Sequence, residues 1–600
     1  MKRITLLILS ILCANILVAQ TSFTIGNFDF ETISSNTVKI TRYNRTTNLT
    51  SVSIPSSVTK NGTTYNVTTI GDYSFWNCSN LDSITIPNSI TTIEEFAFWY
   101  CSGLTSINIP NSVTSIGNNA FENCSSLTSV TISNNVDSIN SYMFSNCNSL
   151  ASISIPNNVT FIGNHAFRGC NLTSITIPAN VNFIGSYAFS STNLRTLYFN
   201  ANNCTNFSTE YSSGVYLPFS ETNISTIIIG NSVEKIPAYF AYELDSVISV
   251  SIGNNVHTID EYAFSGCSNL ASITIPNNVT SINNNAFSGC RSLTSITIPY
   301  SVTTIEKSIF SDCNNLRTLN FNAINCSGNY EINYYSDLPF YNCPISSINI
   351  GDSVEKIPAY IAYDLDSLTS ITIGNSVTTI EEYAFKDCSN LNSITLPNSI
   401  THIGEAAFAT CTRFDSVIFP DNVTSIGNYA FYECESLRSI TIGSNVTSIG
   451  EGAFYDCNNL NNTISLAVMP PTLGEYIFSI TGNLKVPCGS LNSYMSSDWN
   501  SYFTNIEEMC DSIDDGGDIN DSVGINNIEN IDFSFYPNPT SGKLSFDKMV
   551  EKIEVMDMMG KMVMQFCNVS EINIGTLPKG VYCLKLSYDG KATVHKIIKE

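Results

Sequence analysis

A short pattern of hydrophobic and polar positions recurs along most of the chain. In one unit the aliphatic residues Leu81, Ile84 and Ile86 are separated by polar residues, and the unit closes with Ala97-Phe98. Such alternation places aliphatic side chains on one face and hydroxyl side chains on the other, which predicts one short strand per unit. The remainder of the unit, typically V-T-S-I-G-x-x-A-F, directs its apolar side chains inward at irregular spacing and turns at Gly and Asn.

The units repeat every 23 residues over long stretches, as the closing phenylalanines show. These residues are Phe75, Phe98, Phe121, Phe144 and Phe167, then Phe264, Phe287 and Phe310, and then Phe385, Phe408, Phe431 and Phe454. One isolated strand cannot bury its apolar face, so the units are expected to stack as successive coils of a solenoid with parallel strands. Proline follows many of these strands, as at Pro87 and Pro276, where a missing donor ends strand pairing. About 18 units at roughly 4.8 Å each would give a solenoid on the order of 85 Å long.

The repeating unit L-x-x-I-x-I-P…V-x-x-I-G-x-x-A-F-x-x-C resembles the BspA-like branch of the leucine-rich repeat proteins, over roughly residues 48–480. The resemblance implies a leucine-rich repeat solenoid with parallel strands on one flank and irregular or short helical return segments. In this chain Pro-Asn-Ser-Val replaces the Asn-x-Leu step that usually follows the strand, so the resemblance does not imply a ladder of asparagines. We assign the repeats to residues 61–480.

A longer duplication with an offset of 121 residues relates residues 193–264 to residues 314–385. Both copies hold an insertion, so that 30 residues separate Phe189 from Phe219 and Phe310 from Phe340. Insertions in a solenoid are expected on one face and often form contact surfaces. Tyrosine is enriched in both, and aromatic side chains dominate binding hot spots. The candidate ligand-binding residues are therefore Tyr211, Tyr216, Tyr330, Tyr334 and Tyr335.

The segments that flank the repeats predict an exported protein with two caps. Residues 1–19 combine Lys2-Arg3 with an apolar run, which is typical of a secretory signal peptide cleaved between Ala19 and Gln20. Residues 20–60 are expected to cap the first coil and residues 481–510 the last, because terminal repeats must be atypical. Cys488 and Cys510 flank the second cap and form the best disulfide candidate. Residues 511–532 form an acidic linker, and no stretch after the signal peptide is long enough to span a membrane as an apolar helix.

Residues 533–600 have the alternation and turn density of a small antiparallel β-sandwich. The sequence also resembles the C-terminal sorting domain of type IX secretion cargo. The matching residues are Tyr536, Pro537, Asn538, Pro539, Gly542, Gly560, Gly580 and Tyr582, together with the lysine-rich end. The resemblance implies a type IX secretion machinery as partner and passage across the outer membrane. It also implies removal of this domain, after which the chain is anchored at the surface or released.

Charge and cysteine usage narrow the function further. Residues 20–532 hold 15 basic and 44 acidic residues, a balance that disfavours nucleic acid or an anionic membrane as partner. Thirteen of the 20 cysteines fall at one position of the repeat. The side chains of stacked coils run parallel, so we expect buried free thiols. No histidine column accompanies them that would favour a stack of zinc sites.

The sequence contains no arrangement that indicates catalysis. Its four histidines show no paired spacing, and no nucleophile elbow, Walker loop or dinucleotide motif is present. We therefore expect no enzyme activity, no cofactor and no metal site. Outward Ser and Thr of the strands would form a hydroxyl face beside the tyrosine insertions. The sequence thus predicts a cell-surface adhesin that binds host proteins, other bacteria or glycans, or alternatively a carbohydrate-binding accessory protein of a surface or secreted enzyme system.

Overall fold

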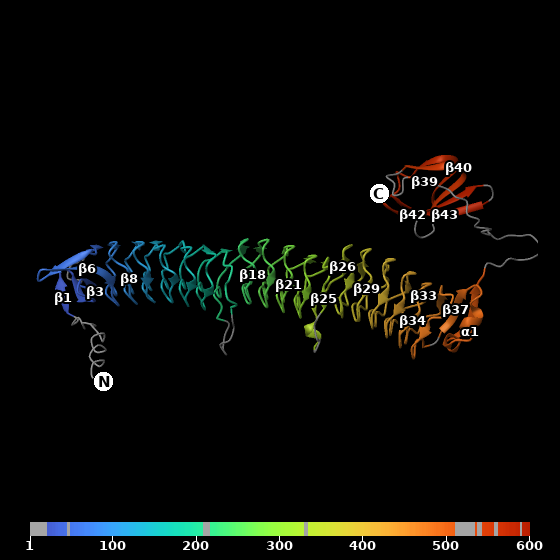
Figure 1. The fold of residues 1–600 in the computed structure, drawn as a ribbon, viewed down its shortest axis with the longest axis horizontal. Helices are drawn as coiled ribbons and strands as arrows, with labels where there is room; N and C mark the ends of the chain where they lie inside the picture. The colour runs from blue at the N-terminus through green and yellow to red at the C-terminus, as the bar shows by residue number, and fades with distance from the viewer. Residues whose placement is uncertain are drawn as a thin grey trace, which may run out of the picture. The chain divides into compact units, whose positions relative to one another are not determined.

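The repeating strands stack in register, so equivalent residues of successive coils lie side by side. The structure is a computed structural model that describes residues 21–44, 49–207, 216–328, 334–479, 481–510, 535–536, 543–556, 562–588 and 591–599. The chain forms two compact units, residues 1–510 and residues 511–600. The first unit is an elongated β-solenoid (Figure 1). The expected signal peptide with its cleavage site at Ala19 and Gln20, and the linker 511–532, lie outside the described residues.

The main row of parallel strands is formed by the L-x-x-I-x-I segments. Ser106 pairs with Ser129 and Ile107 with Val130, so each strand pairs with its equivalent one coil away. The row consists of four sheets. Their strands are β4 (Ser51–Ser53), β7 (Ser83–Thr85), β9 (Ser106–Asn108) and β11 (Ser129–Thr131); β14 (Ser174–Ile177), β16 (Thr196–Phe199), β17 (Thr226–Ile229) and β19 (Ser249–Ser251); β22 (Ser295–Ile298), β24 (Thr318–Phe321), β26 (Ser347–Ile350) and β28 (Ser370–Thr372); and β31 (Ser416–Ile418), β33 (Ser439–Ile442), β35 (Asn462–Ser465), β37 (Thr481–Pro487) and β38 (Phe503–Met509).

The return half of each coil carries a second row of parallel strands, most of them two residues long. Ile380 pairs with Ile403 and Ile403 with Ile426, which places these isoleucines in one buried column. The row comprises β6 (Thr63–Ile70), β8 (Thr92–Ile93), β10 (Ser115–Ile116), β12 (Ser138–Ile139), β13 (Phe161–Ile162), β15 (Phe183–Ile184), β18 (Lys235–Ile236), β20 (Thr258–Ile259), β21 (Ser281–Ile282), β23 (Thr304–Ile305), β25 (Ser327–Gly328), β27 (Lys356–Ile357), β29 (Thr379–Ile380), β30 (His402–Ile403), β32 (Ser425–Ile426), β34 (Ser448–Ile449) and β36 (Thr472–Leu473).

The third side of each coil, which we call the turn flank, follows the second row and contains the closing phenylalanine. Alternate backbone N–H groups there donate to carbonyls of the next coil, as from Tyr383 to Glu405, Phe385 to Ala407 and Asp387 to Ala409. The residues two before and two after the phenylalanine have left-handed backbone, with φ of 56° at Tyr383 and 61° at Asp387. The return segments are therefore irregular and strand-like, and among the described residues of the repeats only the short 3-10 helix η1 (Tyr335–Asp337) is helical.

The core of the solenoid is a ladder of phenylalanine rings flanked by cysteines. Phe98 and Phe121 stack with ring centroids 5.2 Å apart, and Phe121 and Phe144 follow at 5.5 Å. The thirteen column cysteines are free and buried, as expected. Each thiol beyond the first of a run donates to the phenylalanine carbonyl of the preceding coil, as from Cys124 to Phe98 at 3.3 Å. Burial raises the pKa of Cys124 to about 12, so the thiol remains protonated and unreactive.

Two caps close the ends of this core. At the first coil the antiparallel strands β1 (Ser22–Ile25), β2 (Phe28–Thr32) and β3 (Thr37–Tyr43) join β6, which also pairs with β5 (Ser57–Lys60). After the last coil, α1 (Leu491–Met495) and η2 (Asp498–Ser501) bury Tyr494 and Trp499. The Trp499 ring lies 5.9 Å from Phe478 and so covers the last ring of the ladder.

The second unit is an antiparallel sheet with its own apolar core. Its strands are β39 (Phe535–Tyr536), β40 (Lys543–Met556), β41 (Met562–Asn573), β42 (Gly580–Tyr588) and β43 (Lys591–Lys599). The long β40 pairs with β39, β41 and β42, so the described strands form one connected network. Leu544, Ile553, Leu584 and Ile597 are among its fully buried residues.

Candidate functional site

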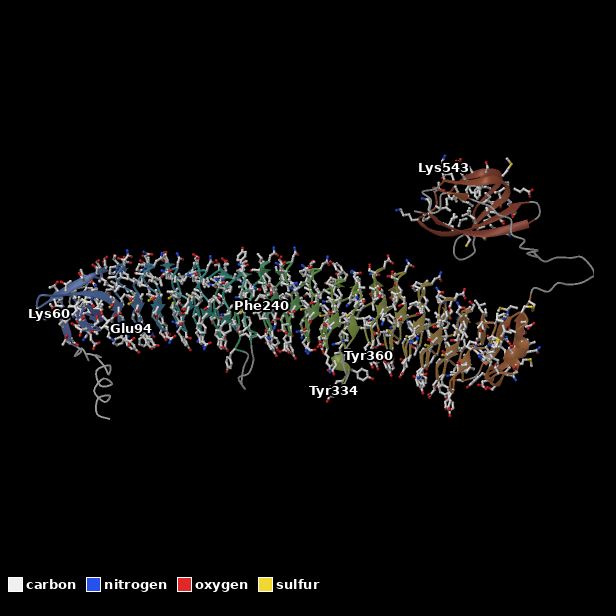
Figure 2. All side chains as sticks on the ribbon, in the orientation of Figure 1. Lys60, Glu94, Phe240, Tyr334, Tyr360 and Lys543 are labelled. Carbon is white, nitrogen blue, oxygen red and sulfur yellow. A yellow bond between two sulfur atoms is a disulfide. The ribbon has the colours of Figure 1, made fainter. Side chains whose placement is uncertain are left out.

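Of the five tyrosines that the sequence singled out, Tyr216, Tyr334 and Tyr335 are described, and they lie where the insertions join the turn flank. Tyr211 and Tyr330 fall outside the described residues. Tyr216 is half-buried, and its ring meets that of Tyr187 edge-on at 5.3 Å. Tyr334 and Tyr335 are 73% and 60% exposed, at η1. Figure 2 shows Tyr334 and Tyr360 near the same edge of the solenoid.

From the coil of Ala362 onward, tyrosines recur on the turn flank at two positions, two residues before the buried closing residue and one residue after it. We call these tyrosines, together with Tyr335 of the second insertion, whose ring contacts Tyr363, the tyrosine track. The track comprises Tyr335, Tyr360, Tyr363, Tyr383, Tyr429, Tyr432, Tyr455 and Tyr476. Four of these residues, Tyr360, Tyr383, Tyr429 and Tyr476, have left-handed backbone, which costs an ordinary side chain roughly 1–2 kcal/mol. Ring contacts of about 0.5–1.5 kcal/mol each offset part of that cost.

Ring contacts connect the first half of the track. The centroids of Tyr335 and Tyr363 lie 6.0 Å apart, and Tyr360 contacts Tyr363 at 6.0 Å. Tyr360 and Tyr383 stack at 4.9 Å with an interplanar angle of 12°. The exposed tyrosine of the second insertion is therefore continuous with the aromatic column of the coils that follow.

The second half of the track continues beyond an interruption. Tyr429 contacts Tyr432 at 5.9 Å, and Tyr432 lies parallel to Tyr455 at 6.2 Å. Tyr455 meets Tyr476, which is 65% exposed, at 6.4 Å. In the coil of Phe408 both track positions are alanine, Ala406 and Ala409, so the aromatic column has a gap there.

This gap opens a groove of about 710 Å³. Ala406, Ala409 and Thr410 line it between the rings of Tyr383 on one side and Tyr429 on the other. Gly452 extends the hollow toward the next coils, because the Tyr429 ring packs against its backbone where a Cβ would otherwise stand. The complete lining is Tyr383, Lys386, Glu405, Ala406, Ala409, Thr410, Tyr429, Tyr432, Glu433, Glu451, Gly452, Tyr455 and Tyr476.

Carboxylates hold the tyrosine hydroxyls of the groove in place. The Tyr383 hydroxyl donates to Glu405 at 2.8 Å, and that of Tyr429 donates to Glu451. Burial and the hydrogen bond to Glu405 raise the pKa of Tyr383 to about 12. A hydrogen bond to the Glu433 carboxylate, together with burial, raises the pKa of Tyr432 to about 12. These phenols are therefore neutral donors at physiological pH, and the negative charge of the groove lies on the glutamates.

The ammonium group of Lys386 lies between two tyrosine rings of the track. The Lys386 Nζ is 5.0 Å from the centroid of Tyr363 and 6.0 Å from that of Tyr383. It donates to the Tyr363 hydroxyl at 3.0 Å and lies 3.7 Å from the Asp387 carboxylate. Burial, with a hydrogen bond to Tyr335, raises the pKa of Tyr363, which keeps that hydroxyl protonated.

Sequence reasoning located the insertions but missed the groove. The signal was present as tyrosine immediately before Ala-Phe in the units of Tyr262, Tyr383 and Tyr429. The period aligns these residues, but the 23-residue pattern alone does not show that their side chains face outward. The left-handed backbone at this position decides that orientation.

A second aromatic cluster lies on the turn flank of the first coils. The rings of Trp76 and Trp99 are nearly parallel with centroids 6.3 Å apart, and Tyr73 stacks on Phe96 at 4.8 Å. Trp76 and Tyr73 are each 47% exposed. This cluster therefore adds partly exposed aromatic surface at the start of the solenoid.

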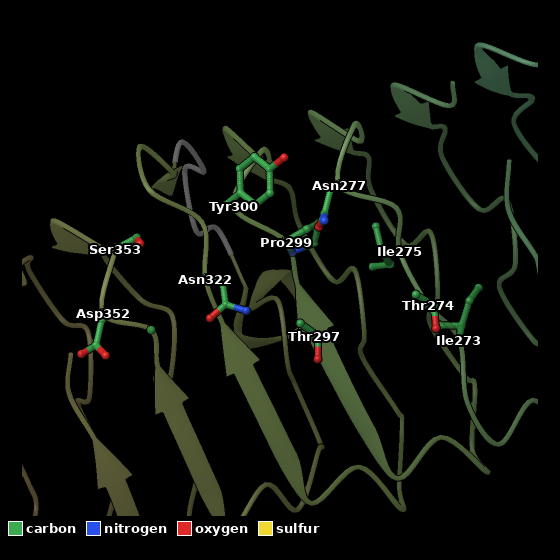
Figure 3. A pocket seen from close by; sticks show the side chains of 11 residues that line it. Ile273, Thr274, Ile275, Asn277, Thr297, Pro299, Tyr300, Asn322, Asp352 and Ser353 are labelled. Carbon is green, nitrogen blue, oxygen red and sulfur yellow. The ribbon is translucent and has the colours of Figure 1, made fainter. Parts of the chain in front are cut away.

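The strand pairing of the main row is interrupted in the coils of Ile153, Ile273 and Ile394, where one sheet ends and the next begins. A hollow of about 460 Å³ lies near the second interruption, and Figure 3 shows Tyr300, Asn322 and Asp352 along its rim. Asp352 is the only charged residue of its lining, so it offers fewer charged contacts than the groove of the tyrosine track.

The described residues offer little for catalysis. His402 Nδ1 and Ser425 Oγ lie 2.7 Å apart, but His402 is exposed on a regular row of strands. A serine nucleophile needs an oriented base in an enclosed site. Cys488, Glu508 and Cys510 have the spacing of metal ligands, but the two cysteines are joined by a disulfide.

The residues of the sorting motif are only partly described. Tyr536 lies in β39, and Gly580 begins β42. Tyr582 is buried, and its hydroxyl donates to the Pro578 carbonyl at 2.9 Å. Pro537, Asn538, Pro539, Gly542 and Gly560 fall outside the described residues. In the part of the chain that the structure describes, no helix is long and apolar enough to cross a membrane.

Comparison with known families agrees with this architecture. The model of the BspA type leucine rich repeat region matches residues 68–195, 128–247, 216–338 and 330–461. The model of the secretion system C-terminal sorting domain matches residues 534–600. No curated protein matches the chain.

Several solved structures are similar. A leucine-rich repeat protein from Bacteroides ovatus is 24% identical over 81% of this chain and 99% of its own, with a TM-score of 0.37. A leucine rich cell surface protein from Faecalibacterium prausnitzii is 27% identical over 74% of this chain and 94% of its own, with a TM-score of 0.28. The pneumococcal vaccine antigen PcpA is 16% identical over 82% of this chain and 99% of its own, with a TM-score of 0.26.

Leucine-rich repeat proteins are generally binding scaffolds without catalytic activity. The sorting domain indicates export to the cell surface or the extracellular space and an interaction with the secretion machinery. Because the matched repeats extend over residues 68–461, the chain belongs to the BspA-type leucine-rich repeat family and carries a C-terminal sorting domain of type IX secretion.

Proposed function

We propose that this protein is a non-enzymatic adhesin whose turn flank binds a protein at the surface of a host or of another bacterium. The observation that carries the proposal is the tyrosine track with its groove. From the coil of Phe340 to that of Phe478 the track crosses seven coils, or roughly 29 Å at about 4.8 Å per step. A surface of that length suits an extended segment of a macromolecule better than a small molecule.

The geometry of the track favours binding for an energetic reason. Stacking and hydrogen bonds already hold Tyr383 and Tyr429 in place. Binding then costs less side-chain entropy than it would for freely rotating residues. Tyrosine also combines a large apolar area with a polar end, which is why it is enriched at binding hot spots.

The charge of the exported body favours a basic partner surface. Residues 20–532 carry 15 basic and 44 acidic residues. Such an excess raises the association rate with positively charged proteins and repels acidic ones. This effect weakens as salt screens the charges.

A glycan ligand is the second candidate, and the tryptophan cluster of the first coils favours it. Trp76 and Trp99 present two nearly parallel ring faces, which suit the apolar face of a sugar. The protein would then serve as a carbohydrate-binding accessory of a surface or secreted enzyme system.

The test uses two variants of the full chain and measures their binding to host cells and to bacterial cells. The track variant replaces Tyr360, Tyr383, Tyr429 and Tyr432 by alanine, and the insertion variant replaces Tyr211, Tyr216, Tyr330, Tyr334 and Tyr335. We expect binding to fall by at least about tenfold, since hot-spot tyrosines contribute 1 kcal/mol or more each. Replacement of Tyr198 and Tyr300, which are exposed outside the track, is the matched control and should leave binding unchanged.

Treatment of the target cells separates the two candidates. Loss of binding after protease digestion of the cells supports the protein ligand, whereas loss after periodate oxidation alone supports the glycan. Unchanged binding by the track variant would overturn the proposal, and unchanged binding by the insertion variant would mean that those residues only pack their loops onto the coils.

A further inference from the structure

We propose that the groove over Ala409 binds a lysine or arginine side chain of the partner protein. This inference rests on the proposed function, because it assumes that the tyrosine track is a binding surface, and it specifies which chemistry the groove recognises. Three features of the groove support the inference. One coil earlier, the ammonium of Lys386 lies between tyrosine rings. At the equivalent position of the next coil stands Ala409, which carries no charge, and the carboxylates around it outnumber the cations.

The occupied example is Lys386. Its ammonium lies over the rings of Tyr363 and Tyr383, donates to the Tyr363 hydroxyl and approaches the Asp387 carboxylate. A cation over an aromatic face with a carboxylate beside it gains both the ring quadrupole attraction and the charge attraction. The chain itself thus shows that the turn flank accommodates an ammonium group between tyrosines.

One coil later the equivalent positions hold no charge. Ala409 stands where Lys386 stands in the preceding unit, and Thr410 stands where Asp387 does. Thr410 donates to Asp387 and so closes the end of the groove toward the occupied site. Tyr429 and Tyr432 line the vacant position from the far side. Among the lining residues, all of which the structure describes, Lys386 is the only basic one.

The charges around the position of Ala409 favour a positively charged ligand. Glu405, Glu433 and Glu451 line the groove against the single ammonium of Lys386. An acidic ligand would meet three carboxylates, and a purely apolar one would cover them without giving them a partner, which is costly. Glu405 and Glu451 each accept one tyrosine hydroxyl, and a carboxylate has further acceptor sites for the N–H groups of a guanidinium or ammonium.

The shape of the groove indicates that the cation belongs to a polypeptide. The groove is open on its outer side and continues into the rings of Tyr455 and Tyr476. Free amines of small molecules would leave most of this surface uncovered. An extended segment with one basic residue over Ala409 would cover it, with neighbouring residues on the rings of the track.

The test uses the full chain and two synthetic peptides in isothermal titration calorimetry. One is a short Gly/Ser peptide that carries two arginines, and the other carries citrulline at the same places, which has nearly the same shape without the charge. We expect the arginine peptide to bind at least about tenfold more tightly, and its affinity to fall as salt is added. Equal affinity of the two peptides would overturn the proposal.

Two groove variants locate the site. In Ala409→Lys the introduced ammonium should occupy the vacant position and reduce arginine-peptide affinity by at least about tenfold. Glu433→Gln together with Glu451→Gln, which adds no bulk, should reduce the affinity about fivefold or more. The control is Glu234→Gln together with Glu355→Gln, which removes two exposed carboxylates outside the groove and should change the affinity less than twofold. Undiminished affinity in the Glu433→Gln, Glu451→Gln variant contradicts the assignment.

The outcomes also separate this inference from the proposed function. If the arginine and citrulline peptides bind equally well while the track variant still loses cell binding, the track binds its partner through other chemistry. If the two peptides bind equally well and the track variant also binds cells normally, both the cation site and the adhesive role of the turn flank are refuted.

Discussion

At the scale of single residues, the closing phenylalanine contributes most to each coil. Phe287 is fully buried, and its ring is parallel to those of Phe264 and Phe310 at 5.4 Å and 5.2 Å. The neighbouring thiol of Cys290 is also fully buried, and its pKa is raised to about 12 by burial. A small apolar residue next to a large one fills the space between coils without introducing a charge.

Phe287→Ala should therefore lower the free energy of unfolding by about 3–5 kcal/mol, the cost of a cavity of this size in a packed core. Equilibrium denaturation in urea, followed by circular dichroism, measures the change. Tyr300→Ala, at a residue that is 54% exposed, is the control and should change stability by less than about 0.5 kcal/mol. A loss below about 1 kcal/mol for Phe287→Ala would show that the neighbouring coils close over the missing ring.

At the scale of the element, the turn flank is defined by its two left-handed positions. The second of these is Asn123 in one coil, Asn146 in the next and Gly169 after that, with φ of 62°, 58° and 71°. Asn and Gly enter this conformation more easily than other residues do. The alternation lets every second N–H donate to the next coil, so the backbone of this side is paired although it is not a regular strand.

Substitutions at Gly289 test whether this position requires a left-handed backbone. It has φ of 72°, and a Cβ there would only touch Gly266 at 3.6 Å, an ordinary contact. Gly289→Val should cost about 1–2 kcal/mol from backbone strain, whereas Gly289→Asn should be nearly neutral because Asn occupies the same position in other coils. Thermal unfolding of the two variants gives the comparison. Equal stability of both would show that this position relaxes to another backbone conformation.

At the scale of the whole molecule, the chain joins an acidic solenoid to a sorting domain of different composition. Residues 20–532 hold 15 basic and 44 acidic residues, whereas residues 533–600 hold nine lysines and seven acids. The sorting domain has its own buried core of Leu544, Ile553 and Leu584. Export is therefore encoded in a unit that is physically separable from the repeats.

Deletion of residues 533–600 should leave the protein in the periplasm with its repeats folded. Protease accessibility of intact cells and fractionation measure the location, and the full chain is the reference. Surface display of the truncated chain at the level of the full chain would refute the role of this domain in export.

The arrangement of the coils could be predicted from the sequence because its cause is local and repeated. The alternation around Leu81 and Ile84 gives each unit one apolar face, and a closing phenylalanine such as Phe98 recurs in most units. These apolar side chains can be buried in every unit only if the units stack on one another. The short helical return segments allowed by the resemblance do not occur in the described coils apart from η1, because coil-to-coil hydrogen bonds through pairs such as Ile380 and Ile403 satisfy the return backbone.

By itself, the sequence determined which residues are buried, where the insertions lie and that the protein is exported, since each of these depends on a pattern within one unit or one motif. Only the tertiary structure decided that Tyr383, Ala409 and Tyr429 together make a groove. These residues belong to three successive coils, and their contact depends on stacking geometry and on a left-handed backbone that brings the tyrosine rings to the surface. A binding surface of a solenoid arises between units, whereas the sequence pattern describes each unit alone.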